Sequence, residues 1–198
     1  MLKTHSDKML ESVHIEAIYS HINEDNFSIS LPGNVSFVCE RGMCRILDDI
    51  TDFDFKFSVE IGDNDFPDFS SKLFVGFEKS AKTYSNVYNF SIQAAIPFDI
   101  IKGGLYIRNK LDGDAYRTCG MTKKLKRMMC DSDIPKSVRN KIPILCDDDG
   151  ILWIPGFRVR DYDKNIGGKM LYLDFVITDL TRNDRFYFAD KRSHYENV

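Results

Sequence analysis

The sequence predicts an α+β fold: an N-terminal helix and a β-rich unit, then a small α+β C-terminal domain with antiparallel or mixed strands and two short helices. Three observations predict it. Apolar residues recur at helical spacing near the N-terminus. Farther along, apolar and polar residues alternate, as in half-buried strands. The charge also changes sign, from 8 Lys and Arg against 16 Asp and Glu in residues 1–100 to 13 against 7 in residues 101–160, which separates an acidic part from a basic one.

Length and composition exclude several classes of protein. The chain has 198 residues, of which 43% are hydrophobic and 13% aromatic, and its net charge is −3. This content suffices for a core and excludes global disorder. No apolar run approaches the ~18 residues of a membrane-spanning helix, and the polar start at 1–7 lacks the apolar region of a secretion signal. We therefore expect a cytoplasmic protein without a membrane partner.

Residues 6–23 are expected to form one amphipathic helix, and residues 1–24 a helical segment before the first domain. Ser6 can cap the helix and Asp7 suits its first turn. The apolar positions at helical spacing are Met9, Leu10, Val13, Ala17, Ile18 and Ile22. A lone helix of this length is marginal in water, so it should dock on another element. It is either a core helix or the end of a larger domain that precedes Met1.

Residues 25–100 are expected to form an acidic, β-rich middle domain. Alternation predicts strands at 27–31, 35–39 and 54–61, and further strands at 72–77 and 87–92. Turns are predicted at 32–34 and 62–65, where glycine, asparagine and aspartate gather. No residue cluster in this part suggests chemistry.

Residues 101–182 are expected to form a separate α+β domain, followed by a polar tail at 183–198. The predicted elements are a strand at 105–109, a loop at 112–117, short helices at 122–130 and 136–141, and a last strand at 169–178. Pro135 suits the start of the second helix. Residues 147–150 (DDDG) between two apolar runs predict a hairpin. A calcium loop is excluded because its first and last ligands would be Leu145 and Gly156.

The predicted helix at 122–130 should have one basic and one apolar face. At about 100° per residue, Leu125, Met128 and Met129 fill one arc. The opposite arc holds Lys123, Lys124, Lys126 and Arg127. No acidic residue lies among these cations, so an anionic partner would relieve their repulsion, although a solvated surface is the alternative. Trp153 and Phe157 could stack on bases, but an apolar strand favours a core position for Trp153.

The sequence contains no catalytic or metal-binding pattern. It has no P-loop, no G-x-G-x-x-G stretch and no nucleophile elbow. Asp112 and Asp114 flank Gly113, which favours a turn over an acid–base pair. The five cysteines include no C-x₂-C pair, and Cys39 and Cys44 are five positions apart. We therefore expect free thiols in a reducing compartment and no bound metal.

A set of short stretches carries a family resemblance. In order they are 105–109 (LYIRN), 113–114 (GD), Gly120 with 123–126 (KKLK), 134–135 (IP), Arg139, 142–143 (IP), 149–156 (DGILWIPG) and Arg158. With this order and spacing, residues 103–161 resemble the C-terminal domain of tRNA(Ile)-lysidine synthases. Upstream, 13–18 (VHIEAI) and 29–33 (ISLPG) resemble the middle region of that family. Residues 48–95 and the tail are poorly covered.

The resemblance implies a function that the composition alone does not. Enzymes of this family use ATP to adenylate the wobble cytidine of an isoleucine tRNA and then attach lysine. Their N-terminal catalytic domain holds a Ser-Gly-Gly-x-Asp-Ser loop, which this sequence lacks. The chain therefore resembles the tRNA-binding C-terminal part, with no catalytic residue and with ATP and Mg²⁺ belonging to the absent domain. The implied partners are the tRNA acceptor stem and that catalytic domain. Whether the chain forms a homodimer stays open.

The resemblance and the charge pattern together place the RNA contacts in the basic segment. The expected phosphate-binding residues are Lys123, Lys124, Lys126 and Arg127, with Arg117, Arg139 and Arg158 as further candidates. At Ala115 the family usually has arginine, and Arg117 is a candidate substitute; at Arg127 the family often has an acidic residue. Two alternatives are a protein-interaction module that binds an acidic surface and a stand-alone enzyme that turns over ATP.

Overall fold

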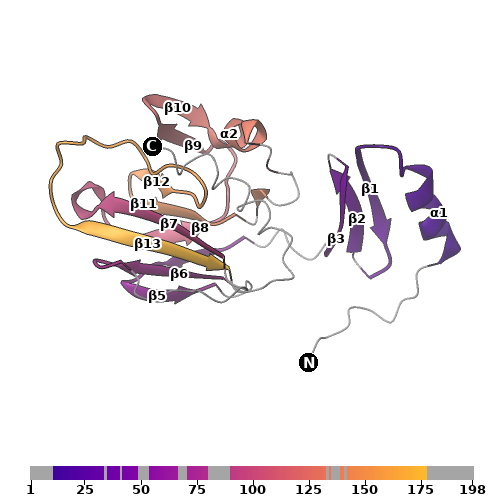
Figure 1. The fold of residues 1–198 in the computed structure, drawn as a ribbon, viewed down its shortest axis with the longest axis horizontal. Helices are drawn as coiled ribbons and strands as arrows, with labels where there is room; N and C mark the ends of the chain where they lie inside the picture. The colour runs from indigo at the N-terminus through magenta and orange to yellow at the C-terminus, as the bar shows by residue number, and fades with distance from the viewer. Residues whose placement is uncertain are drawn as a thin grey trace. The chain divides into compact units, whose positions relative to one another are not determined.

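The computed structural model describes residues 11–33, 35–40, 42–48, 54–66, 71–79, 90–132, 134, 139–140 and 142–177. The chain divides into two compact units, Met1–Asp54 and Phe55–Val198, whose helices and strands are labelled in Figure 1. Antiparallel sheets dominate the described residues and two α-helices accompany them, so the predicted α+β class is confirmed. Neither of these helices has the length and apolar character that crossing a bilayer requires.

The first unit combines one helix with a three-stranded sheet. The helix α1 spans Ser12–Ser20, and the strands are β1 (Asn26–Leu31), β2 (Val35–Glu40) and β3 (Met43–Asp48). The strands pair antiparallel in the order β1-β2-β3. The predicted strands at 27–31 and 35–39 are confirmed, and β3 was not predicted.

The helix α1 is shorter than the predicted 6–23 and makes limited contacts. Its N-cap is Glu11, whose backbone N–H donates to His14 Nδ1 at 3.3 Å; the predicted cap Ser6 lies outside the described residues. No residue of α1 is buried, and Ile15 and Tyr19 are exposed. The helix rests on β1 through the His21 ring that follows it, 5.7 Å from the Phe27 ring.

A disulfide joins Cys39 to Cys44 across β2 and β3, so the prediction that all five cysteines are free is wrong for this pair. The two residues stand directly opposite each other in the antiparallel register. Cross-strand partners bring their Cβ atoms within about 5.5 Å, and the hairpin that creates this proximity was not predicted. Cys119, Cys130 and Cys146 are free thiols.

The second unit contains a four-stranded sheet in the order β5-β6-β13-β7. Its strands are β5 (Gly62–Asp65), β6 (Ser71–Gly76), β7 (Phe90–Pro97) and β13 (Met170–Ile177). The predicted last strand thus lies between β6 and β7 and pairs with both. The expected domain boundary between residues 100 and 101 consequently falls inside one compact unit, because strands from either side of it share this sheet.

A second four-stranded sheet has the order β12-β11-β8-β4. Its strands are β4 (Lys56–Ser58), β8 (Tyr106–Arg108), β11 (Ile144–Asp147) and β12 (Gly150–Trp153). The hairpin of β11 and β12 confirms the predicted one, with Asp147 paired to Gly150. A short 3-10 helix at Phe98–Ile100 follows β7 in the chain.

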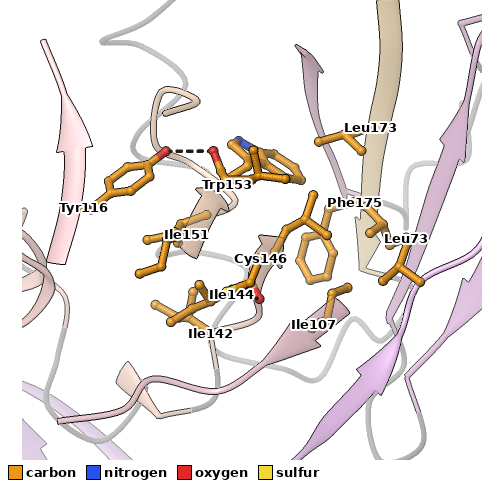
Figure 2. Close-up of a cluster of buried hydrophobic side chains, with 14 of the residues drawn as sticks. Leu73, Ile107, Tyr116, Ile142, Ile144, Cys146, Ile151, Trp153, Leu173 and Phe175 are labelled. Atoms are coloured by element: carbon orange, nitrogen blue, oxygen red, sulfur yellow. Dashed lines mark hydrogen bonds between the residues drawn. The ribbon is translucent and has the colours of Figure 1, made fainter. Parts of the chain in front are cut away.

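Both sheets contribute to one hydrophobic core (Figure 2). Ile107, Ile144 and Trp153 come from one sheet, and Leu73 and Phe175 come from the other. Trp153 is 1% exposed and its indole N–H donates to the Phe157 carbonyl at 3.1 Å. The core position that the sequence favoured for Trp153 is confirmed, which removes it as a base-stacking residue.

Several local predictions are corrected. Residues 62–65 form β5 and not a turn, and the predicted strand at 54–61 is regular only at 56–58. Residues 115–118 form strand β9 (Ala115–Thr118) and not part of a loop. Each of these polar stretches becomes a strand because a partner strand supplies its backbone hydrogen bonds. The predicted helix at 136–141 and the tail at 183–198 lie largely or wholly outside the described residues.

Candidate nucleic-acid interface

The basic segment is a hairpin followed by a helix, and not the single helix that the sequence predicted. Strand β9 pairs with β10 (Met121–Lys124), and α2 spans Leu125–Asp131. Lys123 and Lys124 therefore lie on a strand, where they face Tyr116 and Ala115 in the register. The backbone N–H of Leu125, the first residue of α2, donates to the Asp114 carbonyl at 2.8 Å, which satisfies a group that has no partner within the helix. The predicted apolar face is confirmed, since Leu125, Met128 and Met129 are all buried.

Strand geometry divides the hairpin cations between two faces. Cross-strand partners point to the same face of a sheet, and successive residues to opposite faces. Arg117 faces Thr122 across the pair, and Lys124 faces Ala115. These four residues therefore share one face, on which Arg117 and Lys124 are both exposed. Lys123 lies on the other face, with the fully buried Tyr116.

The helix α2 adds two further exposed cations, Lys126 and Arg127. The Arg127 side chain is 81% exposed and its Nε lies 3.9 Å from the Asp131 carboxylate. Asp131 lies beyond the basic run at 123–127, so that run alone does not indicate this i,i+4 partner. An exposed pair of this kind contributes only about 0.3–0.5 kcal/mol, so Arg127 remains available to an anion. We call Arg117, Lys123, Lys124, Lys126 and Arg127 the basic surface, which includes exposed cations from both faces of the hairpin and from α2.

Few carboxylates pair with the cations of the basic surface. Within the described residues, no acidic side chain forms an ion pair with Arg117, Lys123, Lys124 or Lys126. Arg158 is also exposed, after β12, and its carbonyl accepts a hydrogen bond from the Tyr116 hydroxyl. Arg139 is half-buried, and its Nε donates to the Ile134 carbonyl at 2.9 Å. The Arg158 guanidinium has no carboxylate partner within the described part of the chain, whereas Arg139 is partly engaged by the backbone.

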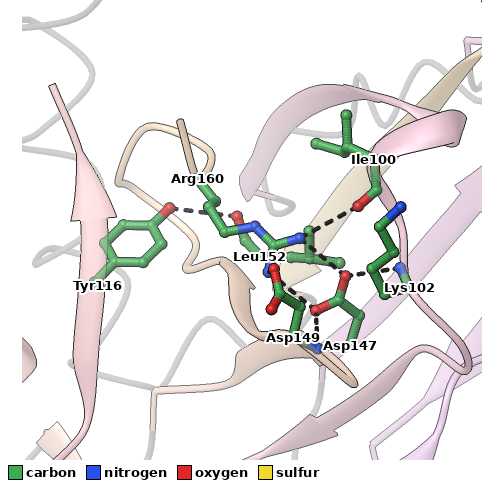
Figure 3. A network of polar contacts seen from close by, with 7 residues as sticks. All are labelled: Ile100, Lys102, Tyr116, Asp147, Asp149, Leu152 and Arg160. Atoms are coloured by element: carbon green, nitrogen blue, oxygen red, sulfur yellow. Dashed lines mark hydrogen bonds and ion pairs between the residues drawn. The ribbon is translucent and has the colours of Figure 1, made fainter. Parts of the chain in front are cut away.

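Two other arginines, outside the hairpin and α2, are neutralised in the folded chain. Arg108 donates through Nη1 and Nη2 to both carboxylate oxygens of Asp114, at 2.7 and 2.8 Å. This hydrogen bonding raises the pKa of the Arg108 guanidinium above its ordinary value. Arg160 forms the equivalent pair with the buried Asp147, as Figure 3 shows. Neither arginine is free to bind a phosphate without breaking a two-pronged ion pair.

The described residues contain no group of three or more His, Cys, Asp or Glu side chains that could hold a metal ion. Between residues 105 and 173, where every aromatic position is described, no aromatic side chain is exposed. The basic surface can therefore attract polyanions through charge and hydrogen bonds. Phe157, the second ring that the sequence offered for base stacking, is half-buried.

Comparison with known proteins finds similarity to tRNA(Ile)-lysidine synthases and to their C-terminal domain. The family described as TilS substrate C-terminal domain matches residues 105–173. The tRNA(Ile)-lysidine synthase of Clostridium tetani is 30% identical over 109 residues, which cover 54% of this chain and 23% of the relative. The synthase of Clostridioides difficile is 28% identical over 159 residues, covering 76% of this chain and 34% of the relative. The chain thus spans about a quarter to a third of the length of these relatives.

Among solved structures, a crystal structure of a TILS C-terminal domain is similar to this chain. The match has a TM-score of 0.48 and 23% sequence identity, and it covers 63% of this chain and 97% of the other.

Proposed function

We propose that this chain, whose residues 105–173 match the family described as TilS substrate C-terminal domain, binds tRNA on behalf of a tRNA(Ile)-lysidine synthase. In this proposal the basic surface contacts the acceptor stem. The attachment of lysine to the wobble cytidine, with its ATP and Mg²⁺, is assigned to an N-terminal catalytic domain that is this chain's protein partner. The chain itself contributes binding and no chemical step.

One observation carries the proposal: the cations of the basic surface lie on consecutive elements, β9, β10 and the start of α2, and stay exposed. Like charges held this close repel one another, and an exposed cluster of them favours a polyanionic ligand. Arg108 and Arg160, which do have carboxylate partners, are by contrast mostly buried. The structure thus pairs the buried arginines with carboxylates and leaves the exposed cations without them among the described residues, which supports a role for the exposed cations in ligand binding.

The chemistry of the surface favours phosphate contacts over base recognition. Lysine and arginine side chains bind phosphate oxygens without reading sequence. Base recognition in single-stranded RNA uses exposed aromatic rings. Here Tyr116 and Trp153 are buried and Phe157 is half-buried. A double-helical stem, which proteins recognise by shape and phosphate positions, is therefore the RNA element that we assign to this surface.

A salt titration of tRNA binding tests the proposal. Fluorescence anisotropy would measure the Kd of labelled tRNA(Ile) between about 50 and 300 mM salt, where log K should fall linearly with log salt by roughly 0.7–0.9 per phosphate contact. Charge reversal in K124E/K126E should weaken binding and flatten this slope by about one unit per lost contact. The control K72E/K79E makes the same charge change in and just after β6 and should leave the slope unchanged.

Other outcomes would point to the alternatives. If the wild-type chain did not bind tRNA, or if K124E/K126E kept both affinity and slope, the RNA-binding proposal would be wrong. Binding of an acidic protein in place of tRNA would identify an interaction module. ATP turnover by this chain would indicate an enzyme in its own right.

A further inference from the structure

The turn that joins β9 to β10 is held by a side chain distant in sequence. Cys119 and Gly120 form this turn, and both have positive φ, 54° and 74°. In a two-residue hairpin turn of this kind, the N–H groups of the two central residues do not bond to the strands. Here both donate to the carboxylate of Asp161, Cys119 N to Oδ1 at 2.8 Å and Gly120 N to Oδ2 at 2.6 Å.

The backbone of Asp161 makes a third contact with the same hairpin. Its N–H donates to the Arg117 carbonyl at 3.0 Å. Arg117 stands one position beyond the closing pair Thr118–Met121, and there the backbone groups of β9 point away from β10. Asp161 therefore binds both the turn and the outer edge of β9, next to a cation of the basic surface.

Asp161 is itself held by its neighbours. The adjacent Arg160 donates its backbone N–H to the Leu152 carbonyl at 2.8 Å, and its guanidinium binds the buried Asp147. These bonds connect the segment to strand β12 and to the β11–β12 hairpin. The β9–β10 hairpin has no other strand partner among the described residues. The buried Tyr116 of β9 and the helix α2 anchor its far end in the core, and Asp161 holds the end that carries the turn.

We infer that Asp161 is a positioning residue for nucleic-acid binding, which fixes the hairpin so that Arg117 and Lys124 meet the RNA backbone without further ordering. This inference rests on the proposed function. A hairpin ordered in advance avoids the entropy cost of ordering on binding. Asp161 carries a negative charge next to a cationic surface, so simple electrostatics assigns it the opposite effect, a weakening of polyanion binding.

Loss of the Asp161 carboxylate should weaken tRNA binding if the residue positions the hairpin and strengthen it if only its charge matters, so one substitution distinguishes the two. The variant D161N keeps the size of the side chain, removes its charge and leaves one amide oxygen in place of two carboxylate oxygens. The matched control D163N removes the same charge two residues along. Among the described residues, that carboxylate accepts bonds only from Asn165 in its own loop. We expect D161N to bind tRNA(Ile) about fivefold more weakly than the wild type, and D163N to bind as tightly as the wild type or more tightly.

Two further readouts separate positioning from direct contact and from unfolding. The salt slope should stay unchanged in D161N, because no phosphate-binding cation is lost. Amide hydrogen exchange at Cys119 and Gly120, measured by NMR on the folded chain, should speed up in D161N and not in D163N. This exchange measurement does not depend on RNA.

The outcomes distinguish the inference from the proposed function. If the wild type bound tRNA and D161N bound as tightly as D163N, the positioning role would be refuted while RNA binding stood. Unchanged exchange at both amides would refute the contact itself. If the wild type failed to bind tRNA, the proposed function would fail, and faster exchange in D161N would still show that Asp161 holds the turn.

Discussion

The guanidinium of Arg160 forms two hydrogen bonds to the carboxylate of Asp147, Nη1 to Oδ1 and Nη2 to Oδ2, each 3.0 Å long. The Asp147 side chain is fully buried and the Arg160 side chain is 13% exposed. The same carboxylate accepts the backbone N–H of Lys102 at 2.9 Å, and Arg160 Nη2 donates to the Ile100 carbonyl at 3.3 Å (Figure 3). One ion pair thus joins the segment after β7, the β11–β12 turn and the segment that carries Asp161.

Replacing Arg160 with leucine should strongly destabilise the chain. The variant R160L leaves the Asp147 carboxylate buried without its charged partner, and losing one member of a buried pair costs about 3–5 kcal/mol. Denaturant unfolding followed by circular dichroism would measure the loss. The matched control R158Q changes an exposed arginine two residues earlier and should stay within about 0.5 kcal/mol of the wild type. Equal stability of R160L and R158Q would contradict the role of the pair.

Arg108 should matter for stability and not for RNA binding. Its guanidinium is fully engaged by Asp114, and the two side chains are only 12% and 11% exposed. The variant R108Q should lower the free energy of unfolding by about 1.5–3 kcal/mol. At a temperature where it remains folded, its salt slope for tRNA binding should equal that of the wild type. A flatter slope in R108Q would show that Arg108 contacts phosphate.

Charge reversal at the two neighbouring lysines of β10 should affect the salt dependence of tRNA binding to different extents. Lys124 shares a hairpin face with Arg117, whereas Lys123 lies on the face of the buried Tyr116. We therefore expect K124E to flatten the salt slope by about one unit and K123E to change it less. Both variants make the same charge change at adjacent positions, so each is the control for the other. Equal effects would mean that the total charge matters and the strand faces do not.

The free thiols should react at very different rates. Cys119 and Cys130 are exposed, whereas Cys146 is fully buried, and this burial raises the pKa of the Cys146 thiol from 9.0 to about 11. Thiolates are the reactive form, so a disulfide reagent added to the folded chain should modify Cys119 and Cys130 rapidly and Cys146 only after unfolding. Mass spectrometry of digested samples would assign the sites. Rapid modification of Cys146 in the folded chain would contradict its burial.

The same thiol should make stability fall at alkaline pH. Between pH 9 and 11 the unfolded chain loses the Cys146 proton while the folded chain keeps it, so the unfolded state is favoured as the pH rises. Urea unfolding of the wild type should therefore show a decline through this window. In C146A that contribution should be absent, and the difference in stability between the two proteins should shrink as the pH rises.

Elements with strong local patterns were predictable. The β11–β12 hairpin follows from two apolar runs around an aspartate-glycine turn, and β13 follows from period-two alternation. The buried side of α2 was found although the helix starts three residues later than predicted, because Leu125, Met128 and Met129 are too apolar for any other position. These features depend on residues that are close in sequence, and the periodicity of apolar residues reports only such local relationships.

Elements that depend on a distant partner were not predictable. Thr122 and both lysines of β10 fit a polar helix as well as a strand, and the pairing with β9 decides between them. The turn at Cys119 and Gly120 lacks the usual asparagine or aspartate before glycine, although Gly120 was an available signal. Asp161 has no local feature that indicates its bonds to a turn about forty residues earlier.

The sequence by itself determined that a basic segment follows an acidic one, and that any buried cation in it would need a partner, because burying an unpaired charge is prohibitively costly. Only the tertiary structure decided which cations of the segment remain free. Arg108 and Arg160 are bound by carboxylates, whereas Arg117, Lys124 and Lys126 have no carboxylate partner among the described residues. The reason is physical: an ion pair requires a few ångströms in space, and the distance between two residues along the chain does not determine that separation.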